Sequence, residues 1–268
     1  MNSDLLWILK QPSLMSTPQG VKPFTWLIDR LGNSVGSKVN IDLTKQPKRL
    51  GIYYENLVER TLLNTDQPIV LKRNIQVKKH KTTLGEFDFI GRIGSDDFHL
   101  ECAIKFYLRV GPGNNLSDYV GPGKKDRLDI KWNRMLEHQL PLSSCTEGIQ
   151  VCQDHHLSPQ TKVLLLQGYL FHPFQEGTPK QLADEINPQH LQGWWLRSRD
   201  ISLLGEQYQT AIMQKPYWLN AAITETIDKS SLKEVVKETN FPLLVTRGMM
   251  SEGSWQEHDR GFIVPDSW

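Results

Sequence analysis

The chain has 268 residues, of which 38% are hydrophobic and 23% are charged, and its formal net charge is +1. This is the composition of an ordinary globular protein that can bury a sizeable core. The absence of a long apolar run and of a signal-peptide pattern predicts no membrane span and no secretion, and the three cysteines favour a reducing cytoplasm over a disulfide framework.

Charge is unevenly distributed along the chain. Residues 1–134 carry a net charge of +7, and residues 135–268 carry −6. Such asymmetry indicates that one part of a protein faces a polyanion, although a solvated surface gives the same pattern.

The first half contains two helices and a strand before its most informative segment. Residues 5–14 predict a short helix that ends at Pro12, and residues 18–48 are irregular. Apolar residues at helical spacing predict an amphipathic helix over residues 49–64, with Glu55 at the edge of its apolar stripe. Residues 68–77 predict a strand, which is followed by the basic run Lys78–Lys81.

Residues 84–108 predict a β-hairpin with its turn at residues 94–97. Because side chains alternate along a strand, Glu86 and Asp88 share one face of the first strand. On the second strand, His99, Glu101 and Lys105 share a face with Ala103. The hairpin therefore gathers acids and a lysine within very apolar surroundings.

A basic helix is predicted over residues 126–140. Its apolar stripe includes Leu128 and Trp132, and a second stripe is basic. With two preceding lysines, the basic residues predicted to contact phosphates are Lys124, Lys125, Arg127, Lys131 and Arg134. An amphipathic helix with a solvated basic side is the alternative.

The second half yields strands over residues 161–174, 193–196, 242–246 and 261–264, and helices over residues 203–213 and 231–238. Two Val-Gly-Pro-Gly copies, ending at Gly113 and Gly123, fail the phosphate-loop pattern and predict rigid turns. Cys145, Cys152, His155 and His156 are the residue types of a zinc site, but their spacing favours loop residues without a ligand role.

Acidic side chains that converge from adjacent strands are suited to a hard divalent cation such as Mg²⁺ or Mn²⁺. Such a cation activates water and polarises a phosphoryl oxygen, and a neighbouring lysine stabilises the charge of the transition state. Glu86, Asp88, Glu101 and Lys105 supply these groups. From residue types alone, a solvent-facing cross-strand Glu/Lys pair is equally good.

The order of these motifs resembles the PD-(D/E)XK nuclease superfamily, which has an α-β-β-β-α-β core. Segments along most of the chain are also similar to the bacterial domain-of-unknown-function 1853 family, which is grouped with those nucleases. The segments that carry this resemblance are residues 49–55, 83–89, 100–108, 121–128, 168–171 and 193–195.

The resemblance implies a role for each matching residue. Asp88 corresponds to the metal-binding aspartate, Glu101 to the second-strand acid and Glu55 to the helix glutamate. Glu86 has no counterpart among these positions and, from its place on the face of Asp88, is expected to support the metal. The superfamily usually has Glu-x-Lys, but this chain has Ala103 at the lysine position. Lys105 lies one pleat further along the same face and would position the attacking water, and Lys131 is another candidate.

Gln139 resembles a glutamine that some exonuclease branches of the superfamily carry after the core. A glutamine that caps a packed helix is the alternative interpretation for this residue.

The resulting prediction is a single α/β domain over residues 1–268, with a restriction-endonuclease-like core, a mixed central sheet flanked by helices, over residues 46–140. Residues 141–268 form a C-terminal α+β extension that completes and covers the sheet. The predicted function is Mg²⁺- or Mn²⁺-dependent hydrolysis of phosphodiester bonds in nucleic acid, with no organic cofactor. The alternative is a catalytically inactive module of this fold that binds nucleic acid or a protein.

Overall fold

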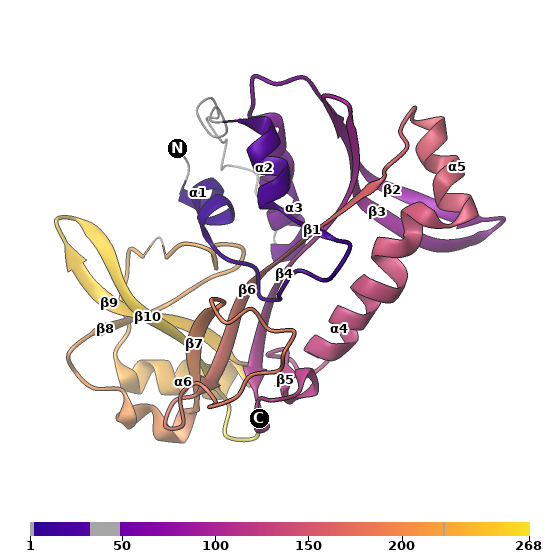
Figure 1. Cartoon of the computed structure of the whole chain (residues 1–268). Coiled ribbons are helices and arrows are strands. Elements are labelled where there is room, and N and C mark those ends of the chain that lie inside the picture. The colour runs from indigo at the N-terminus through magenta and orange to yellow at the C-terminus, as the bar shows by residue number, and fades with distance from the viewer. Residues whose placement is uncertain (1–2, 33–48, 222) are drawn as a thin grey trace. The chain divides into compact units, whose positions relative to one another are not determined.

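The computed structural model describes residues 3–32, 49–221 and 223–268 (Figure 1). The fold is α/β, with a mixed β-sheet flanked by helices, which confirms the coarse class predicted from the sequence. The described chain divides into two compact units. Unit 1 contains residues 3–32, Gly51–Ile104 and Ile130–Gln167, and unit 2 contains residues 49–50, Lys105–Asp129 and Gly168–Trp268.

Unit 1 is built on the predicted hairpin. Its elements, some of which continue into unit 2, are α1 (Ser3–Lys10), β1 (Lys22–Pro23), α2 (Thr25–Leu31), α3 (Leu50–Leu63), β2 (Ile69–Lys79), β3 (Thr82–Ile93), β4 (Asp96–Arg109), α4 (Leu128–Arg134), the π-helical turn η2 (Met135–Gln139), the 3-10 segment η3 (Leu140–Ser144), α5 (Thr146–Asp154) and β6 (Thr161–Pro173). Strands β2, β3 and β4 are antiparallel neighbours, and β1 pairs with β6 in parallel.

Unit 2 contains the remaining strands. Its further elements are η1 (Leu116–Asp118), β5 (Tyr119–Val120), β7 (Leu191–Arg197), η4 (Ser198–Leu203), β8 (Gln209–Ile212), α6 (Lys229–Thr239), β9 (Leu243–Ser251) and β10 (Ser254–Val264). Strand β7 lies between β6 and β10 and is parallel to both, whereas β9 is antiparallel to β10 and to β8.

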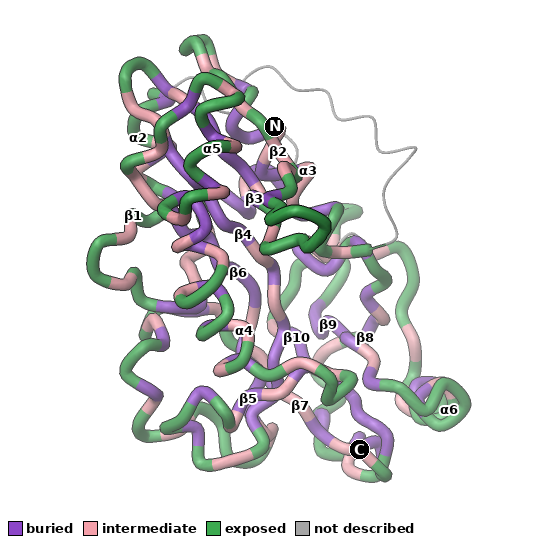
Figure 2. Tube along the Cα trace, turned by 90° about the vertical axis from the view of Figure 1, so that its right-hand side faces the viewer, coloured by how far each residue is buried: buried purple, intermediate pink, exposed green. Residues whose placement is uncertain are grey.

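Each unit has an apolar cluster of its own. In unit 1, β2 and β3 pack against the η3–α5 segment through Val77, Phe87 and Leu142. In unit 2, β7 and β9 pack against α6 through Leu196, Val245 and Val236. Figure 2 shows the strands largely buried and much of α6 exposed.

Most predicted elements agree with the structure. The helices predicted over residues 49–64 and 231–238, and the five strand segments, are confirmed as α3, α6, β2, β6, β7, β9 and β10. The hairpin is confirmed as β3 and β4. The basic helix is shorter than predicted, because α4 changes into a π-helical turn after Arg134.

The helix predicted over residues 203–213 is wrong. The chain ends the 3-10 helix η4 at Leu203, and Gln209–Ile212 pairs with β9 as an edge strand. Tertiary pairing therefore overrides a weak helical pattern. Helix α5 has few apolar residues and was not predicted. The irregular segment includes β1 and α2, and its part from residue 33 to 48 lies outside the described residues.

No helix in the described ranges is long and apolar enough to cross a membrane.

Candidate active site

The candidate site lies in unit 1, at the place where the β3–β4 ladder ends. The ladder extends from Ile93 and Asp96 to Phe89 and Leu100. Phe87 and Phe89 are fully buried, whereas Glu86 is exposed and Asp88 is half-buried, so the predicted alternation of faces on β3 is correct. Beyond the ladder, carboxylates accept hydrogen bonds from the backbone N–H groups.

Asp88 and Glu101 are joined through these backbone groups. The Cys102 N–H donates to Asp88 Oδ2 at 2.9 Å, and the Asp88 N–H points to Glu101 Oε1 at the long distance of 3.5 Å. Glu101 has no exposed surface. The two acids predicted to bind a metal are therefore brought together by the local geometry of the hairpin.

Both acids hold their protons more tightly than usual. Burial is the main cause that raises the pKa of Glu101 to about 7, and burial and the charge of Glu101 raise the pKa of Asp88 to about 7. The Lys131 charge and the Cys102 N–H oppose the shift at Asp88. Two neighbouring carboxylates in a place of low polarity favour any cation that neutralises them.

His99 and Ser143 support Glu101 from the interior. His99 Nε2 lies 2.8 Å from Glu101 Oε1, and His99 Nδ1 lies 3.1 Å from Ser143 Oγ. Burial lowers the pKa of His99 to about 3, so its ring is neutral at neutral pH. A neutral ring accepts one hydrogen bond and donates one, and the Ser143 hydroxyl can do either. Glu101 therefore keeps a partner whether or not it carries a proton.

Gln139 and Lys131 reach Glu101 from the opposite side. The Gln139 amide donates to Glu101 Oε2 at 2.5 Å, and Lys131 Nζ donates to Gln139 Oε1 at 3.0 Å. Gln139 is the last residue of the π-helical turn η2. Short π turns within helices are common at functional sites. The interpretation of Gln139 as a helix cap does not include this contact with Glu101.

Two further predicted acids, Glu55 and Glu86, interact electrostatically at this site. Glu55 on α3 bonds to Arg73 on β2 at 3.4 Å, and Arg73 also bonds to Glu59 at 2.7 Å. Burial raises the pKa of Glu55, and the charges of Asp88 and Glu86 raise it further. Glu55 therefore responds to the charges of both Asp88 and Glu86, although it lies on a helix and they lie on β3.

Lys105, the lysine predicted to position water, belongs to unit 2. Its Nζ donates to Asp126 Oδ2 at 2.6 Å. Lys131, the other lysine considered, belongs to unit 1 with the acids.

The predicted phosphate-contacting residues are divided between the units. Lys124, Lys125 and Arg127 belong to unit 2, whereas Lys131 and Arg134 belong to unit 1. Lys124 lies over the ring of Trp268, with its Nζ 4.3 Å from the ring centroid. The Arg127 guanidinium donates to both carboxylate oxygens of Asp129, at 2.6 and 2.8 Å. Lys125 and Arg134 are exposed.

The donor set of the site is a pair of carboxylates. No group of three or more His, Cys, Asp or Glu side chains is arranged to hold a metal within the part of the chain that the structure describes. This includes the zinc alternative, in which Cys145 instead caps α5 by accepting from the Gly148 N–H at 3.3 Å. Mg²⁺ is commonly held by one or two carboxylates together with waters and phosphate oxygens, so Asp88 and Glu101 fit that ion.

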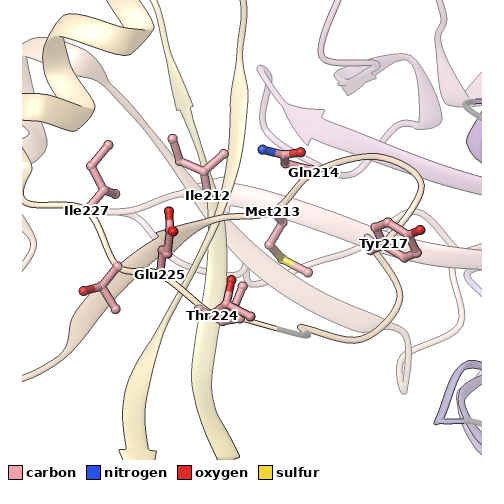
Figure 3. Close-up of a pocket in the computed structure, with 9 residues that line it drawn as sticks. Ile212, Met213, Gln214, Tyr217, Thr224, Glu225 and Ile227 are labelled. Atoms are coloured by element: carbon pink, nitrogen blue, oxygen red, sulfur yellow. The ribbon is translucent and has the colours of Figure 1, made fainter.

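A separate hollow of about 450 Å³ lies in unit 2 beside β8 (Figure 3). Ile212, Met213, Tyr217 and Glu225 are among its lining residues. None of the residues predicted to form the active site lines this hollow.

The fold and the site define an α/β protein with a buried carboxylate pair at the end of a hairpin ladder. A family model described as "Domain of unknown function (DUF1853)" matches residues 3–264, so the chain belongs to this family. This confirms the finer of the two resemblances seen in the sequence. Neither the search of curated proteins nor that of solved structures gave a match.

Proposed function

We propose that this protein is a divalent-cation-dependent phosphodiesterase that acts on nucleic acid, with a restriction-endonuclease-like core. The observation that carries the proposal is the pair of neighbouring carboxyl groups of Asp88 and Glu101, one half-buried and one fully buried, with a pKa of about 7 each. Burying two neighbouring acids costs free energy, and a bound cation would offset this cost. A buried acid pair with raised pKa values is therefore a candidate cation site.

Asp88 and Glu101 would hold Mg²⁺ or Mn²⁺, with Glu55 and Glu86 adding negative charge nearby. The cation, when bound, would lower the pKa of a water molecule and polarise a phosphoryl oxygen. The protein's own residues orient the acids. The Cys102 N–H fixes Asp88, and His99 and Gln139 fix the two oxygens of Glu101.

Lys131 is better supported than Lys105 as the residue that faces the attacked phosphate. Its ammonium group belongs to the same hydrogen-bonded chain as Glu101, and its charge opposes the raised pKa of both acids. Lys105 instead forms an ion pair with Asp126. A lysine is long and flexible enough to serve from a helix when the strand position is occupied by alanine.

The proposal is tested with purified protein, Mn²⁺, and labelled single- and double-stranded DNA and RNA. Wild-type protein should cleave at least one substrate, and Asp88→Asn should lower the rate at least about 100-fold because a neutral amide is a poor ligand for Mn²⁺. Asp184→Asn, which changes an exposed acid in unit 2, should cleave as the wild type does. Cleavage that is equal in wild type and Asp88→Asn would identify a contaminant and refute the proposal.

A second candidate function is a binding module of this fold without catalysis. The observation that favours it is Ala103 at the position of the usual lysine, together with the engagement of Lys105 by Asp126. In that case nucleic acid would bind without a divalent cation, Asp88→Asn would bind equally well, and no preparation would cleave.

A further inference from the structure

The hairpin of β2 and β3 ends in a basic tip that has no role in the proposed site. Residues 67–85 contain five lysines and arginines and no acidic residue. Lys78, Lys79 and Lys81 lie at the tip and are exposed, and Lys79 forms an ion pair with Glu147 of α5 at 3.0 Å. The other two lie further back on β2, where Lys72 pairs with Ile90 and Arg73 with Phe89. The turn at residues 80–81 is the end of the β2–β3 hairpin in Figure 1.

This concentration of charge is local. The described residues of unit 1 contain 13 lysines and arginines and 13 aspartates and glutamates, so the unit as a whole is neutral. A neutral unit does not attract polyanions over a long range, whereas a basic tip attracts them where it lies. The charge therefore marks a contact surface rather than a generally basic protein.

The shape of the hairpin suits an extended polyanion. Strand β2 lies at the end of the strand order and pairs with β3 from Ile69–Ile93 to Lys79–Thr82. A β-bulge between Val77 and Lys78 shifts the register, and bulges increase the twist of a ribbon. A twisted two-stranded ribbon has dimensions that the major groove of a duplex admits.

The tip lies at a defined distance from the acids. Lys81 precedes Asp88 by seven residues, almost all of them in β3, which at about 3.3 Å per residue amounts to roughly 23 Å. Successive nucleotides of one strand are about 3.4 Å apart along a duplex, so this distance corresponds to about seven nucleotides.

We infer that the tip of the β2–β3 hairpin, carried by Lys78, Lys79 and Lys81, binds the phosphodiester backbone of a nucleic acid about seven nucleotides from Asp88. This inference rests on the proposed function, because it names a contact of the same substrate. It places a second anchoring point on unit 1, in addition to the basic residues predicted on α4.

The experiment measures binding in the Asp88→Asn background, in EDTA, so that cleavage cannot interfere. The probes are fluorescein-labelled 20-nucleotide DNA and RNA strands, a 20-base-pair DNA duplex, and a four-nucleotide DNA strand. The hairpin variant carries Lys78→Gln, Lys79→Gln and Lys81→Gln. A control variant with the same change of charge carries Lys180→Gln, Lys233→Gln and Lys237→Gln, which are exposed in unit 2. Circular dichroism checks that both variants are folded.

The hairpin variant should bind at least one 20-nucleotide probe about tenfold more weakly at low salt, and the control should not. The slope of log affinity against log salt should fall by about 2 in the hairpin variant, since each lost phosphate contact removes roughly 0.7–0.9. The four-nucleotide strand is too short to reach the tip, so both variants should bind it equally.

Equal binding of all 20-nucleotide probes by the two variants, or no binding at all, would overturn the inference. Cleavage by the wild type combined with equal binding would reject the hairpin and leave the proposed function intact. Loss of binding in the hairpin variant, combined with no cleavage by the wild type, would reject the enzyme and retain the hairpin as a contact.

Discussion

At the scale of single residues, the central feature is the pair of carboxyl groups of Asp88 and Glu101. Beyond the end of the β3–β4 ladder, they accept hydrogen bonds from backbone N–H groups of the opposite strand. Glu101 has three polar partners, namely His99, Gln139 and the backbone of Asp88, and each of them fixes one of its oxygens. A buried acid with so many partners is costly to remove and well oriented. The same partners keep the carboxylate in place when its charge changes.

The raised pKa values make the stability of the protein depend on pH. A carboxyl group whose pKa is higher in the folded state stabilises the fold at low pH, and this contribution is lost as the pH rises through the folded value, here about 7. As the pH is raised from 6 to 8.5 in EDTA, wild type should lose this contribution and Asp88→Asn should not. The difference in unfolding free energy should therefore change by roughly 1–2 kcal/mol in favour of the variant.

Urea denaturation at several pH values measures this difference. The comparison with wild type is needed because the buried histidines His99, His172 and His190, whose pKa values are lowered, act in the opposite direction below about pH 6.5. A difference that stays constant over this range would mean that Asp88 is ionised in the folded protein throughout.

Alternation along the hairpin was enough to place Glu86 and Asp88 on the face of β3 opposite Phe87 and Phe89, because a strand of known phase determines which side chains share a face. The roles of His99 and Ser143 could not be predicted. His99 was placed on the face of Glu101, but nothing in the sequence indicates that Ser143, 44 residues away, contacts its ring. The proximity of Lys131 to Gln139 depends on a helical irregularity, which has no clear sequence signal.

At the scale of elements, the close approach of β6 to β4 in unit 2 depends on Gly168. Its φ is +135°, and a Cβ atom there would lie 1.7 Å from the carbonyl oxygen of Lys105. The neighbouring atom belongs to the backbone and cannot move aside as a flexible side chain would. The sequence showed Gly168 within a strand but gave no reason for it.

Gly168→Ala should therefore destabilise the protein by at least about 2 kcal/mol, because it combines a clash with backbone strain. Gly177→Ala is the matched control. Its φ is also positive, at +65°, but a Cβ atom there meets nothing within 4 Å. The control should cost about 1 kcal/mol from strain alone. Denaturant unfolding of both variants distinguishes the two contributions, and equal costs would show that the strands separate to admit a methyl group.

At the scale of the whole molecule, the sequence predicted the α/β class and most elements but not the division into two units. The distribution of charge along the chain did not indicate the boundaries of these units. The predicted contrast between a basic first half and an acidic second half disappears in the fold, because Arg49 and the net charge of +2 on residues 105–129 belong to unit 2, whereas the described residues of unit 1 are neutral. Strands with strong alternation were found reliably, whereas β8, α2 and α5 are short elements that depend on their neighbours.

A bound cation should be detectable as a local change in unit 1. At a Mn²⁺ concentration 100 times its dissociation constant, the bound state gains about 2.7 kcal/mol over states that lose the site. Hydrogen exchange should then slow by up to about 100-fold in β3 and β4 around Asp88 and Cys102 and in η2, with β9 and β10 unchanged. Asp88→Asn should abolish the effect, and equal slowing in that variant would place the cation elsewhere.

The π-helical turn has a consequence for the spacing of residues along the chain. Lys131 and Gln139 are eight residues apart, which in a regular α-helix would turn them about 80° away from each other. The turn absorbs one residue, and seven residues bring two positions back to within about 20° of the same direction. A chain that lost one residue between positions 135 and 138 and formed a regular helix would therefore still direct its glutamine towards the lysine. The contact depends on the angle between the two residues around the helix, so the deletion of one residue at this point is compatible with it, which simple counting of residues would not suggest.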